Sequence, residues 1–354
     1  MTFVIVILGL AVLVLIHEFG HFLVAKLLGI KVEEFGVGFP PRILKKKIGN
    51  TLYSLNLLPF GGFVRLYGED EAASDIADGR IGEGMEKGFN GELAWKKSLV
   101  VLAGVFMNVA LGWILLSLVF MIGVPRHLMI AEIAPNSPAM TAGLQPGDII
   151  SGIVAGSVKL SDPISSDDFT KLVESYSMPV NLDIERGGQK LNLNISPRAN
   201  PPEGQGPIGI NITDVGFGAQ PFFQSLGSGF LSGWETVKMV VSGLGTFVAE
   251  LFTSPQSIQN VAGPVGIVVL AAQATSMGFI YFVQLLALIS INLAVLNLLP
   301  FPALDGGRFL FLLIDKFRGK PVPYKIQAWV NGAGFVILIL LMVFVTVKDI
   351  GRLL

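Results

Sequence analysis

The sequence contains no cysteine, and this absence narrows the chemistry available to the chain. Without cysteine there are no disulfide bonds and no thiolate metal sites, so any bound metal must be held by histidine, aspartate or glutamate. Histidine is scarce as well, because the 354 residues include only 3: His17, His21 and His127. Two of these lie within one five-residue segment, and a metal bound there would take its remaining ligand from His127 or from a carboxylate.

Charge is the second property that the sequence has little of. Charged residues make up 14% of the chain against 52% hydrophobic residues, a balance typical of a membrane protein. The net charge of -1 gives no indication of a nucleic-acid partner, since such proteins carry basic surfaces. The low charge content also leaves several long stretches without any ionisable group.

Four apolar stretches are long enough to cross a membrane, which takes about 20 residues of helix. The first, residues 1–29, has no basic residue before its apolar run and is too long for a cleaved signal peptide, so we expect a retained span. The others are residues 98–125, 279–299 and 326–348. The sequence thus predicts a polytopic α-helical membrane protein with about four transmembrane helices.

Basic residues are concentrated in the connections 30–97 and 300–325, which follow the first and third predicted spans. Because basic loops stay in the cytoplasm, we expect both connections there, with the N-terminus, the C-terminus and the segment after residue 125 on the outer side. Lys348 and Arg352 run against this assignment. The first span would then end at the cytoplasmic side.

The HExxH motif of His17, Glu18 and His21 lies within residues 1–25, which hold no other ionisable group. Ionisable side chains inside a membrane span are costly and usually functional. In a helix, residues four positions apart project from one face, so both histidines can bind one zinc ion while Glu18 borders the open coordination position. This arrangement suits hydrolysis, because a carboxylate next to an activated water can take its proton. The alternative, two histidines satisfied by neighbouring helices, would leave Glu18 buried and unpaired.

The third protein ligand should come from a distant segment at a similar depth. Asp305 is the best candidate, because it is the first charge after the third span and ends a run without carboxylates from residue 251 onward. Pro300 and Pro302 break the helix and the glycines that follow Asp305 let the backbone approach closely, so the carboxylate can turn inward. His127 is the rival ligand, but it would lie across the membrane from the end of the first span.

Residues 126–213 differ from the rest, with polar turns and short β-rich runs that predict a small soluble α/β module. Within it, the segment 139–150 resembles the signature of a PDZ domain, in which a short helix, a glycine turn and a strand follow one another. Residues 165–175 would form the second helix, beside the peptide groove. Either this groove binds a peptide ligand or the module only blocks access to the membrane part, because fold alone does not establish function.

Residues 214–278 mix aromatic and apolar side chains with glycine, serine and few charges. This pattern predicts amphipathic helices at the outer membrane interface. A linker helix packed on the preceding module would show the same pattern.

The connection 30–97 contains a segment, residues 51–66, that reads as two β-runs around a turn at residues 59–62. An open strand edge is tolerated at membrane depth only where protein or a cavity covers it, and it can serve as a template for an extended substrate. A helical substrate hides its peptide carbonyls in backbone hydrogen bonds, so pairing with such an edge would hold it open to attack. The alternative is a plain cytoplasmic hairpin.

Together these features resemble the site-2 protease family of intramembrane zinc metalloproteases, whose signatures are HExxH in the first core helix and NxxPxxxxDG in the third. Both are present here, and the second runs from Asn297 to Gly306. The order of segments is similar to that of bacterial RseP-type members with a single PDZ domain, and the resemblance covers nearly the whole chain. It implies a membrane-reentrant β-hairpin and a location in the bacterial cytoplasmic (inner) membrane.

The resemblance also assigns roles to particular residues. It implies one Zn²⁺ per chain, held by His17, His21 and Asp305, with Glu18 as the catalytic base. It implies substrate contacts for two asparagines of the third span, for which interhelical hydrogen bonding is the alternative. These asparagines are Asn292 and Asn297, and the hairpin residues expected to contact substrate are Leu57, Phe60, Gly61 and Gly62.

The expected activity is zinc-dependent cleavage of the transmembrane segments of single-pass membrane proteins. Anti-sigma factors and signal-peptide remnants are the substrates that the resemblance suggests. The alternative is a non-catalytic membrane protein that binds or transports metal and recruits partners through the PDZ module. One substitution distinguishes the enzyme from the non-catalytic protein. If the protein is a protease, Glu18→Gln should keep its zinc and lose cleavage.

Overall fold

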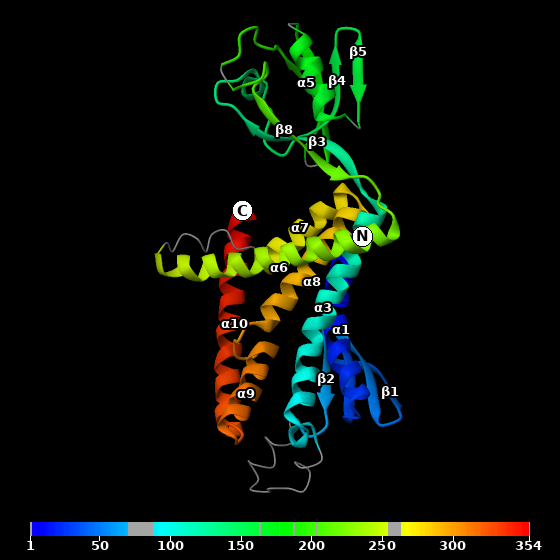
Figure 1. Cartoon of the computed structure of the whole chain (residues 1–354), viewed down its shortest axis with the longest axis vertical. Coiled ribbons are helices and arrows are strands. Elements are labelled where there is room, and N and C mark those ends of the chain that lie inside the picture. The colour runs from blue at the N-terminus through cyan, green and yellow to red at the C-terminus, as the bar shows by residue number, and fades with distance from the viewer. Residues whose placement is uncertain are drawn as a thin grey trace. The chain divides into compact units, whose positions relative to one another are not determined.

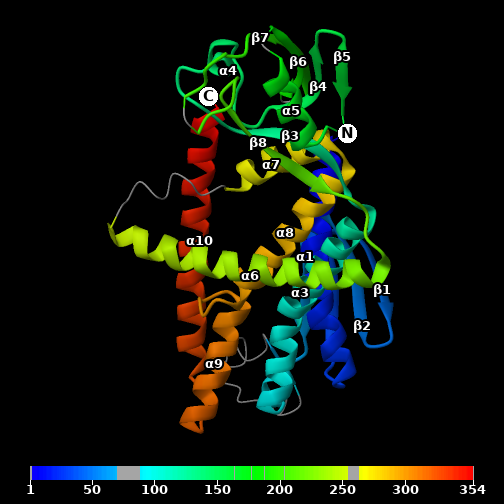
Figure 2. The ribbon, with the colours of Figure 1, turned by 45° about the horizontal axis from the view of Figure 1, so that its top comes forward.

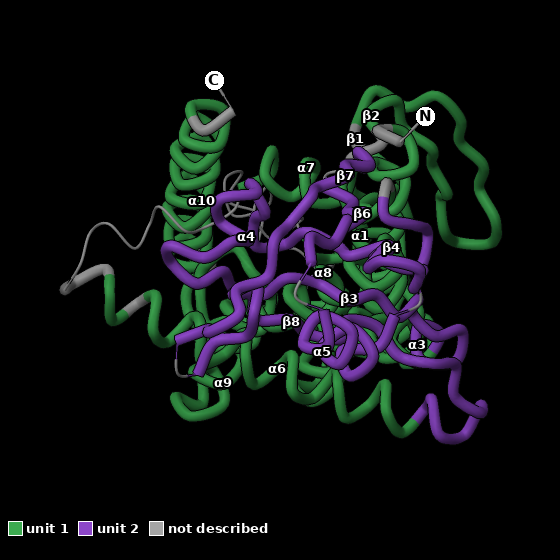
Figure 3. Tube along the Cα trace, turned by 90° about the horizontal axis from the view of Figure 1, so that it is seen from above, with its two compact units in different colours: residues 1–117, 227–275, 282–354 green, residues 118–226, 276–281 purple. Residues whose placement is uncertain are grey.

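A computed structural model of the chain (Figure 1) describes residues 2–69, 88–162, 164–176, 178–186, 188–202, 204–253 and 263–353. The chain divides into two compact units, which Figure 3 colours separately. Unit 1 comprises residues 1–117, 227–275 and 282–354, and unit 2 comprises residues 118–226 and 276–281. Unit 1 holds the apolar helices, and unit 2 holds most of the β-structure.

Among the described residues, four helices are long and apolar enough to cross a membrane: α1 (Thr2–Leu27), α3 (Ala94–Ile122), α8 (Phe279–Leu298) and α10 (Tyr324–Leu353). The prediction of four helices long and apolar enough to span a membrane is therefore confirmed. Their apolar side chains also cover surfaces that face no other part of the protein, and α10 exposes Phe335, Leu340 and Phe344. A large exposed apolar surface of this kind suits lipid and not water.

Unit 1 also contains shorter or more polar helices: the 3-10 helix η1 (Phe89–Gly91), α6 (Phe222–Thr253, from residue 227 on), α7 (Pro264–Met277) and α9 (Asp305–Arg318). Helix α6 runs across the spans (Figure 2). It can approach α3 closely because a Cβ on Gly229 would overlap Ser117, and its Phe230 ring meets Trp113 edge-on.

Helix α9 lies in the connection 300–325, for which the sequence analysis specifies no secondary structure. It begins directly after the turn that contains Pro302 and ends at Gly319, which has the left-handed conformation (φ +67) common at helix C-termini. The consequence is that Asp305 opens a helix and does not lie in an irregular loop.

Strands β1 (Val32–Ile48) and β2 (Thr51–Leu66) form a sheet after α1. Residues 42–48 pair with residues 51–56 around a tight turn at Gly49 and Asn50. This turn joins β1 to β2 and is separate from the bend predicted at residues 59–62, which lies within β2.

The segment 34–37 shows how the two runs of β2 are arranged. Its residues pair in parallel with residues 52–55 on one side and antiparallel with residues 62–65 on the other. The two β-runs predicted within β2 are thus present and run in opposite directions, but the segment 34–37 lies between them. Local alternation of residue types could not reveal this, because the pairing partner of a strand is set by tertiary packing.

A buried carboxylate ties this sheet together. Glu34 is 2% exposed and accepts hydrogen bonds from Arg42 Nε (3.0 Å), Arg42 Nη2 (2.6 Å) and Ser54 Oγ (2.7 Å). Arg65 Nη1 lies 4.0 Å from the same carboxylate. Because these partners come from the three other runs of the sheet, one fully paired charge links all four.

The sheet packs along α1. At the end of that helix, Lys26 Nζ donates to Thr51 Oγ1 at 2.6 Å, and the Thr51 hydroxyl donates to Val32 O at 2.8 Å. Further along, the rings of Phe22 and Phe35 lie 5.0 Å apart. The strands therefore follow the half of α1 that carries the HExxH motif.

Unit 2 contains an antiparallel sheet in the order β7-β6-β4-β3-β8, with β5 paired to β4. The strands are β3 (Val124–Ile133), β4 (Ile149–Ala155), β5 (Val158–Ser161), β6 (Val180–Arg186), β7 (Gln189–Ile195) and β8 (Ile210–Phe217). Its helices are α4 (Pro138–Thr141) and α5 (Ser166–Ser175). The short helix, glycine turn and strand predicted at 139–150 are present as α4, Gly143 (φ +82) and β4.

This sheet has a hydrophobic core of its own. Leu128, Ile150, Leu182 and Ile184 are fully buried, and Phe169 of α5 packs on them. Ser165 caps α5 by accepting a hydrogen bond from the Asp168 amide, so the helix predicted at 165–175 is confirmed. A closed core of this kind is what an independent module requires.

Removing the partner of the Glu34 carboxylate tests whether this charge holds the first sheet together. We expect Arg42→Met to lower the free energy of unfolding by about 3 kcal/mol, the lower end of the range for a buried charge that loses its partner. The lower end applies because the Arg42 side chain is itself 44% exposed. Thermal unfolding in detergent measures the change, and Lys45→Met, on an exposed position of the same strand, is the control. Equal unfolding of the two variants would contradict this role of Glu34.

Candidate metal centre

Helix α1 presents both histidines of the HExxH motif to the interior of unit 1. The helix is continuous from Thr2 to Leu27 because nothing in its apolar sequence interrupts it, so residues four apart project from one face. His17 Nε2 and His21 Nε2 lie 3.2 Å apart. Their side chains are only 10% and 13% exposed. The two imidazoles thus form a buried pair, as the motif predicts.

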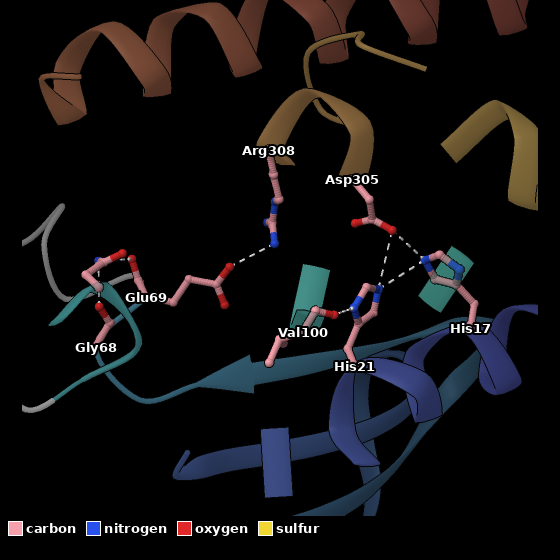
Figure 4. A network of polar contacts seen from close by, with 8 residues as sticks. His17, His21, Gly68, Glu69, Val100, Asp305 and Arg308 are labelled. Carbon is pink, nitrogen blue, oxygen red and sulfur yellow. Dashed lines mark hydrogen bonds and ion pairs between the residues drawn. The ribbon is translucent and has the colours of Figure 1, made fainter. Parts of the chain in front are cut away.

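Asp305 joins this pair from a distant segment. Its Oδ2 atom lies 3.1 Å from His17 Nε2 and 3.4 Å from His21 Nε2 (Figure 4). The chain reaches Asp305 from α8 through a turn in which Ala303 has φ +72. A non-glycine residue in this conformation costs about 1–3 kcal/mol, so its surroundings must hold it there. One such support is Asn331 of α10, whose Oδ1 accepts from the Ala303 amide at 3.3 Å.

The glycine after Asp305 allows the carboxylate to turn inward. A Cβ on Gly306 would overlap the carbonyl oxygens of Leu298 and Leu299. The first turn of α9 therefore packs directly on the last turn of α8, an approach that any side chain would prevent. The expectation that the glycines permit a close backbone approach is confirmed.

Helix α3 forms another wall of this cluster, and the sequence analysis did not identify it. A Cβ on Gly104 would overlap His21 Nε2 and the His17 ring, so only glycine fits there. One turn earlier, Val100 O accepts a hydrogen bond from His21 Nδ1 at 2.7 Å. The sequence did carry a signal, because Val100, Gly104 and Asn108 recur every four residues and Asn108 is the only amide in the run 98–125.

The donor set of His17, His21 and Asp305 fits zinc. Two imidazoles and one carboxylate are the ligands of many catalytic zinc sites, and the three ligand atoms lie within 4.8 Å of one another. Among the described residues, Asp305 Oδ2 is a buried oxygen without a hydrogen-bond donor in good geometry, as expected of an atom that binds a cation. The bond from His21 Nδ1 to a backbone carbonyl is the arrangement that leaves Nε2 free for metal.

The charge of Asp305 also suits a cation. Burial acts to raise the pKa of its carboxyl, but the two imidazoles beside it outweigh this effect. The pKa of Asp305 therefore lies below its usual value, and the group is ionised at neutral pH.

Glu18 borders the same space as the three ligand residues. All four line one cavity of about 380 Å³. Another wall comes from the last run of β2, and a Cβ on Gly62 at the start of that run would lie 3.4 Å from Glu18 Cγ. The remaining lining residues are Val14, Phe63, Val64, Leu66, Glu69, Phe89, Val100, Val101, Asn297, Ala303, Leu304 and Arg308.

The structure places the two predicted asparagines differently. Asn297 lines the cavity. Asn292 donates its side-chain amide to Leu288 O in its own helix at 2.9 Å and does not line the cavity. Position therefore connects Asn297, and not Asn292, with the metal cluster.

The predicted hairpin residues are also divided. Gly62 lies against Glu18, and Gly61 has φ +91 at the bend that precedes it. Leu57 is exposed and does not line the cavity. The side chain of Phe60 lies outside the described residues.

His127, the rival third ligand, belongs to unit 2. Its Nδ1 atom lies 2.8 Å from Asp162 Oδ2. In the described part of the chain, the group of histidine and acidic residues that could hold a metal consists of His17, His21 and Asp305. This grouping agrees with the choice of Asp305 over His127.

Arg308 lies at the rim of the cavity, one turn after Asp305. Its Nη1 atom lies 2.8 Å from Glu69 Oε1, so this ion pair joins the start of α9 to the turn after β2 (Figure 4). Exposed pairs of this kind contribute at most about 1 kcal/mol to stability. The ion pair therefore adds little stability, and the relevant feature of Arg308 is that it lines the cavity.

The helices and the site together define a class, the membrane-embedded metallopeptidases. A family model described as Peptidase family M50 matches residues 5–341. The chain belongs to this family and is a zinc metalloprotease, with Zn²⁺ as its expected cofactor.

Named relatives agree with this assignment along their whole length. A candidate zinc metalloprotease of Clostridium perfringens is 35% identical over 352 residues, covering 99% of this chain and 98% of its own length. The zinc metalloprotease RasP of Shouchella clausii is 32% identical over 418 residues, with 97% of each chain covered. The regulator of sigma-W protease RasP of Bacillus subtilis is 29% identical over 415 residues, with 96% of each covered. These bacterial relatives and the four apolar helices indicate a protein of the bacterial inner membrane.

The contact between Gly104 and the two imidazoles leads to a prediction. Gly104→Ala should weaken zinc binding by about 10- to 100-fold, the range found when the support of a ligand is disturbed, because the new methyl group would displace His21. Competition with a zinc chelator on the purified protein measures the affinity. Gly243→Ala is the matched control. Gly243 lies on α6, and nothing lies within 4 Å of a Cβ added there. Unchanged zinc affinity in the Gly104 variant would rule out this role.

Proposed function

We propose that this protein is an intramembrane endopeptidase that cuts single-pass membrane proteins within or near their transmembrane helix. The observation that carries the proposal is the meeting of His17, His21 and Asp305 around one point, with Glu18 on the wall of the same buried cavity. A binding or transport protein has no need for a glutamate at that position. Membership of a peptidase family also favours an enzyme over the non-catalytic alternative.

In this proposal His17, His21 and Asp305 hold the zinc ion. When bound there, zinc supplies Lewis-acid chemistry, which makes water more acidic and polarises a carbonyl group. Glu18 acts as the general base, taking a proton from the attacking water and then delivering it to the leaving amine.

The substrate has to be extended before a peptide carbonyl can be attacked. We assign this task to the last run of β2, residues 62–66, which pairs with the segment 32–37 on one side and lines the cavity with its side chains. An extended substrate could add to its other side by main-chain hydrogen bonds. This use of an edge at membrane depth corresponds to a membrane-reentrant hairpin, since the cavity shelters the edge from lipid.

The remaining substrate contacts follow from position. Asn297 faces the cavity and can hydrogen-bond a substrate peptide group, while Gly61 and Gly62 keep the backbone near Glu18 free of side chains. We retain Leu57 and Phe60 as apolar contacts for parts of the substrate farther from the cut. Asn292 is the weakest member of the set, because its amide is already bonded within α8.

The orientation of the protein in the membrane follows from its basic connections. Residues 30–97 and 300–325 carry most of the lysine and arginine near the spans, so we propose that they face the cytoplasm and that the site opens toward that side. The two chain ends and the module at 126–213 would then lie outside, with 214–278 at the outer interface.

We further propose that the module at 126–213 is a PDZ domain that excludes substrates with bulky outer domains. The physiological substrates would then be remnants that another protease has already trimmed, such as shortened anti-sigma factors or signal-peptide remnants. Whether the domain also binds a peptide in its groove is a separate question, and exclusion needs no such ligand.

The role of Glu18 can be separated from that of the zinc ligands. Glu18→Gln should reduce cleavage of a reporter transmembrane helix by about 100- to 10,000-fold, the usual contribution of a general base, while zinc content stays at the wild-type level. Asp305→Ala should lose both zinc and activity. Cleavage products are followed by gel electrophoresis in detergent, and zinc by elemental analysis. A Glu18→Gln protein that still cleaves the reporter at the wild-type rate would rule out the proposed mechanism.

The exclusion role of the module makes a different prediction. Because Val124 pairs with Phe217, the chain enters and leaves the module at neighbouring points, so residues 126–213 can be replaced by a short Gly-Ser linker. The shortened protein should cleave both a trimmed substrate and one that keeps its outer domain, whereas the full chain should cleave only the trimmed one. An unchanged substrate range after the deletion would show that the module does not exclude substrates.

A further inference from the structure

Asn108 is a buried amide beside the metal cluster that the proposed chemistry leaves without a role. It lies on α3 and is 0% exposed. Its Nδ2 atom lies 3.4 Å from His17 Nδ1, the ring nitrogen that points away from Asp305. In the part of the chain that the structure describes, its Oδ1 atom has no hydrogen-bond partner. A buried polar atom without a partner costs about 1–3 kcal/mol, so its presence calls for an explanation.

The explanation begins with the tautomer of His17. Its Nε2 atom is the one that faces Asp305 and His21, so it must be free of hydrogen when it binds zinc. The proton of the neutral imidazole then sits on Nδ1, and this N–H group needs an acceptor. His21 meets the same requirement through Val100 O at 2.7 Å.

For His17, the structure places the amide of Asn108 beside Nδ1, and the unpartnered oxygen of this amide is a suitable acceptor. As the amide stands, Nδ2 faces His17 Nδ1, which suits an imidazole whose Nε2–H points at Asp305. A rotation of the amide by half a turn about its Cβ–Cγ bond exchanges the two ends and brings Oδ1 to His17 Nδ1. An amide can serve either tautomer of the ring in this way, whereas an apolar side chain can serve neither.

The position of Asn108 is fixed from two directions. Gly104, one turn earlier on α3, brings the helix against both imidazoles. On the other side, Ser290 of α8 is fully buried and donates its hydroxyl to the backbone carbonyl of Asn108 at 2.8 Å. The side chain can therefore rotate, but it cannot move away from His17.

We propose that Asn108 is a positioning residue, which accepts a hydrogen bond from His17 Nδ1 and so keeps His17 Nε2 directed at the zinc site. This proposal rests on the role of His17 as a zinc ligand given above. Asn108 touches neither substrate nor metal and acts through His17. Supporting residues of this kind typically change zinc affinity by about 10- to 100-fold when they are replaced.

Two substitutions at this position separate hydrogen bonding from packing. Asn108→Leu keeps a similar volume but offers no acceptor, so zinc affinity measured by chelator competition should fall by about 10- to 100-fold. Asn108→Asp offers only acceptor oxygens and should keep the affinity of the wild type or exceed it. Ser117→Ala is the control, because Ser117 lies on the same helix and its hydroxyl donates to Trp113 O, one turn earlier in that helix. Zinc affinity should not change in this variant.

A second measurement covers the case in which the leucine variant does not fold. In the zinc-bound wild type with ¹⁵N-labelled histidine, the nitrogen shifts of His17 should show a protonated Nδ1, and Asn108→Asp should preserve this pattern. A protonated Nε2 on His17 would overturn the proposal. So would an Asn108→Leu protein that binds zinc as tightly as the wild type, or an Asn108→Asp protein that binds it as weakly as Asn108→Leu.

The His17→Ala variant distinguishes this failure from failure of the proposed function. If His17→Ala binds zinc as tightly as the wild type, His17 is not a ligand, and both the proposed site and the role of Asn108 are wrong. If His17→Ala loses zinc but Asn108→Leu keeps it, the zinc site stands and only the role of Asn108 is wrong.

Discussion

The constraint on which the rest of this structure depends is the burial of polar ligands inside an apolar helix bundle. Two imidazoles and two carboxylates are expensive at membrane depth unless each has a partner. His17, His21 and Asp305 solve this by meeting one another, and a cation bound among them would neutralise the carboxylate. The surrounding elements have to approach closely enough to exclude lipid and to hold this geometry.

One face of α3 supplies much of that support. Three residues on it, each four positions after the last, perform different tasks: Val100 offers a carbonyl, Gly104 offers space, and Asn108 offers an amide. The spacing follows from the helix itself, since positions i, i+4 and i+8 form one stripe. A helix that looks like a plain membrane span in composition is thus a specific partner of the metal cluster.

The sheet that follows α1 brings the backbone of the chain to the same place. Glu34, buried and bonded to Arg42 and Ser54, fixes four runs of chain whose last run ends beside the cavity. Gly62 allows that run to lie close to Glu18. The structure therefore brings together a metal cluster and a strand, the two elements that the proposed cleavage of a membrane helix requires, because such a helix must be unwound before it can be attacked.

The sequence by itself determined the class, the spans and the chemical groups, because HExxH in an apolar run, the NxxPxxxxDG segment and four apolar stretches are local patterns. It also determined α4, β4 and α5 of the module, whose turns and caps are local too. Only the tertiary structure decided the insertion of residues 34–37 between the two runs of β2, the helical start of α9 and the contacts of α3 with both histidines. These features depend on which segments pack together, and the periodicity of a segment does not tell which distant segment it packs against.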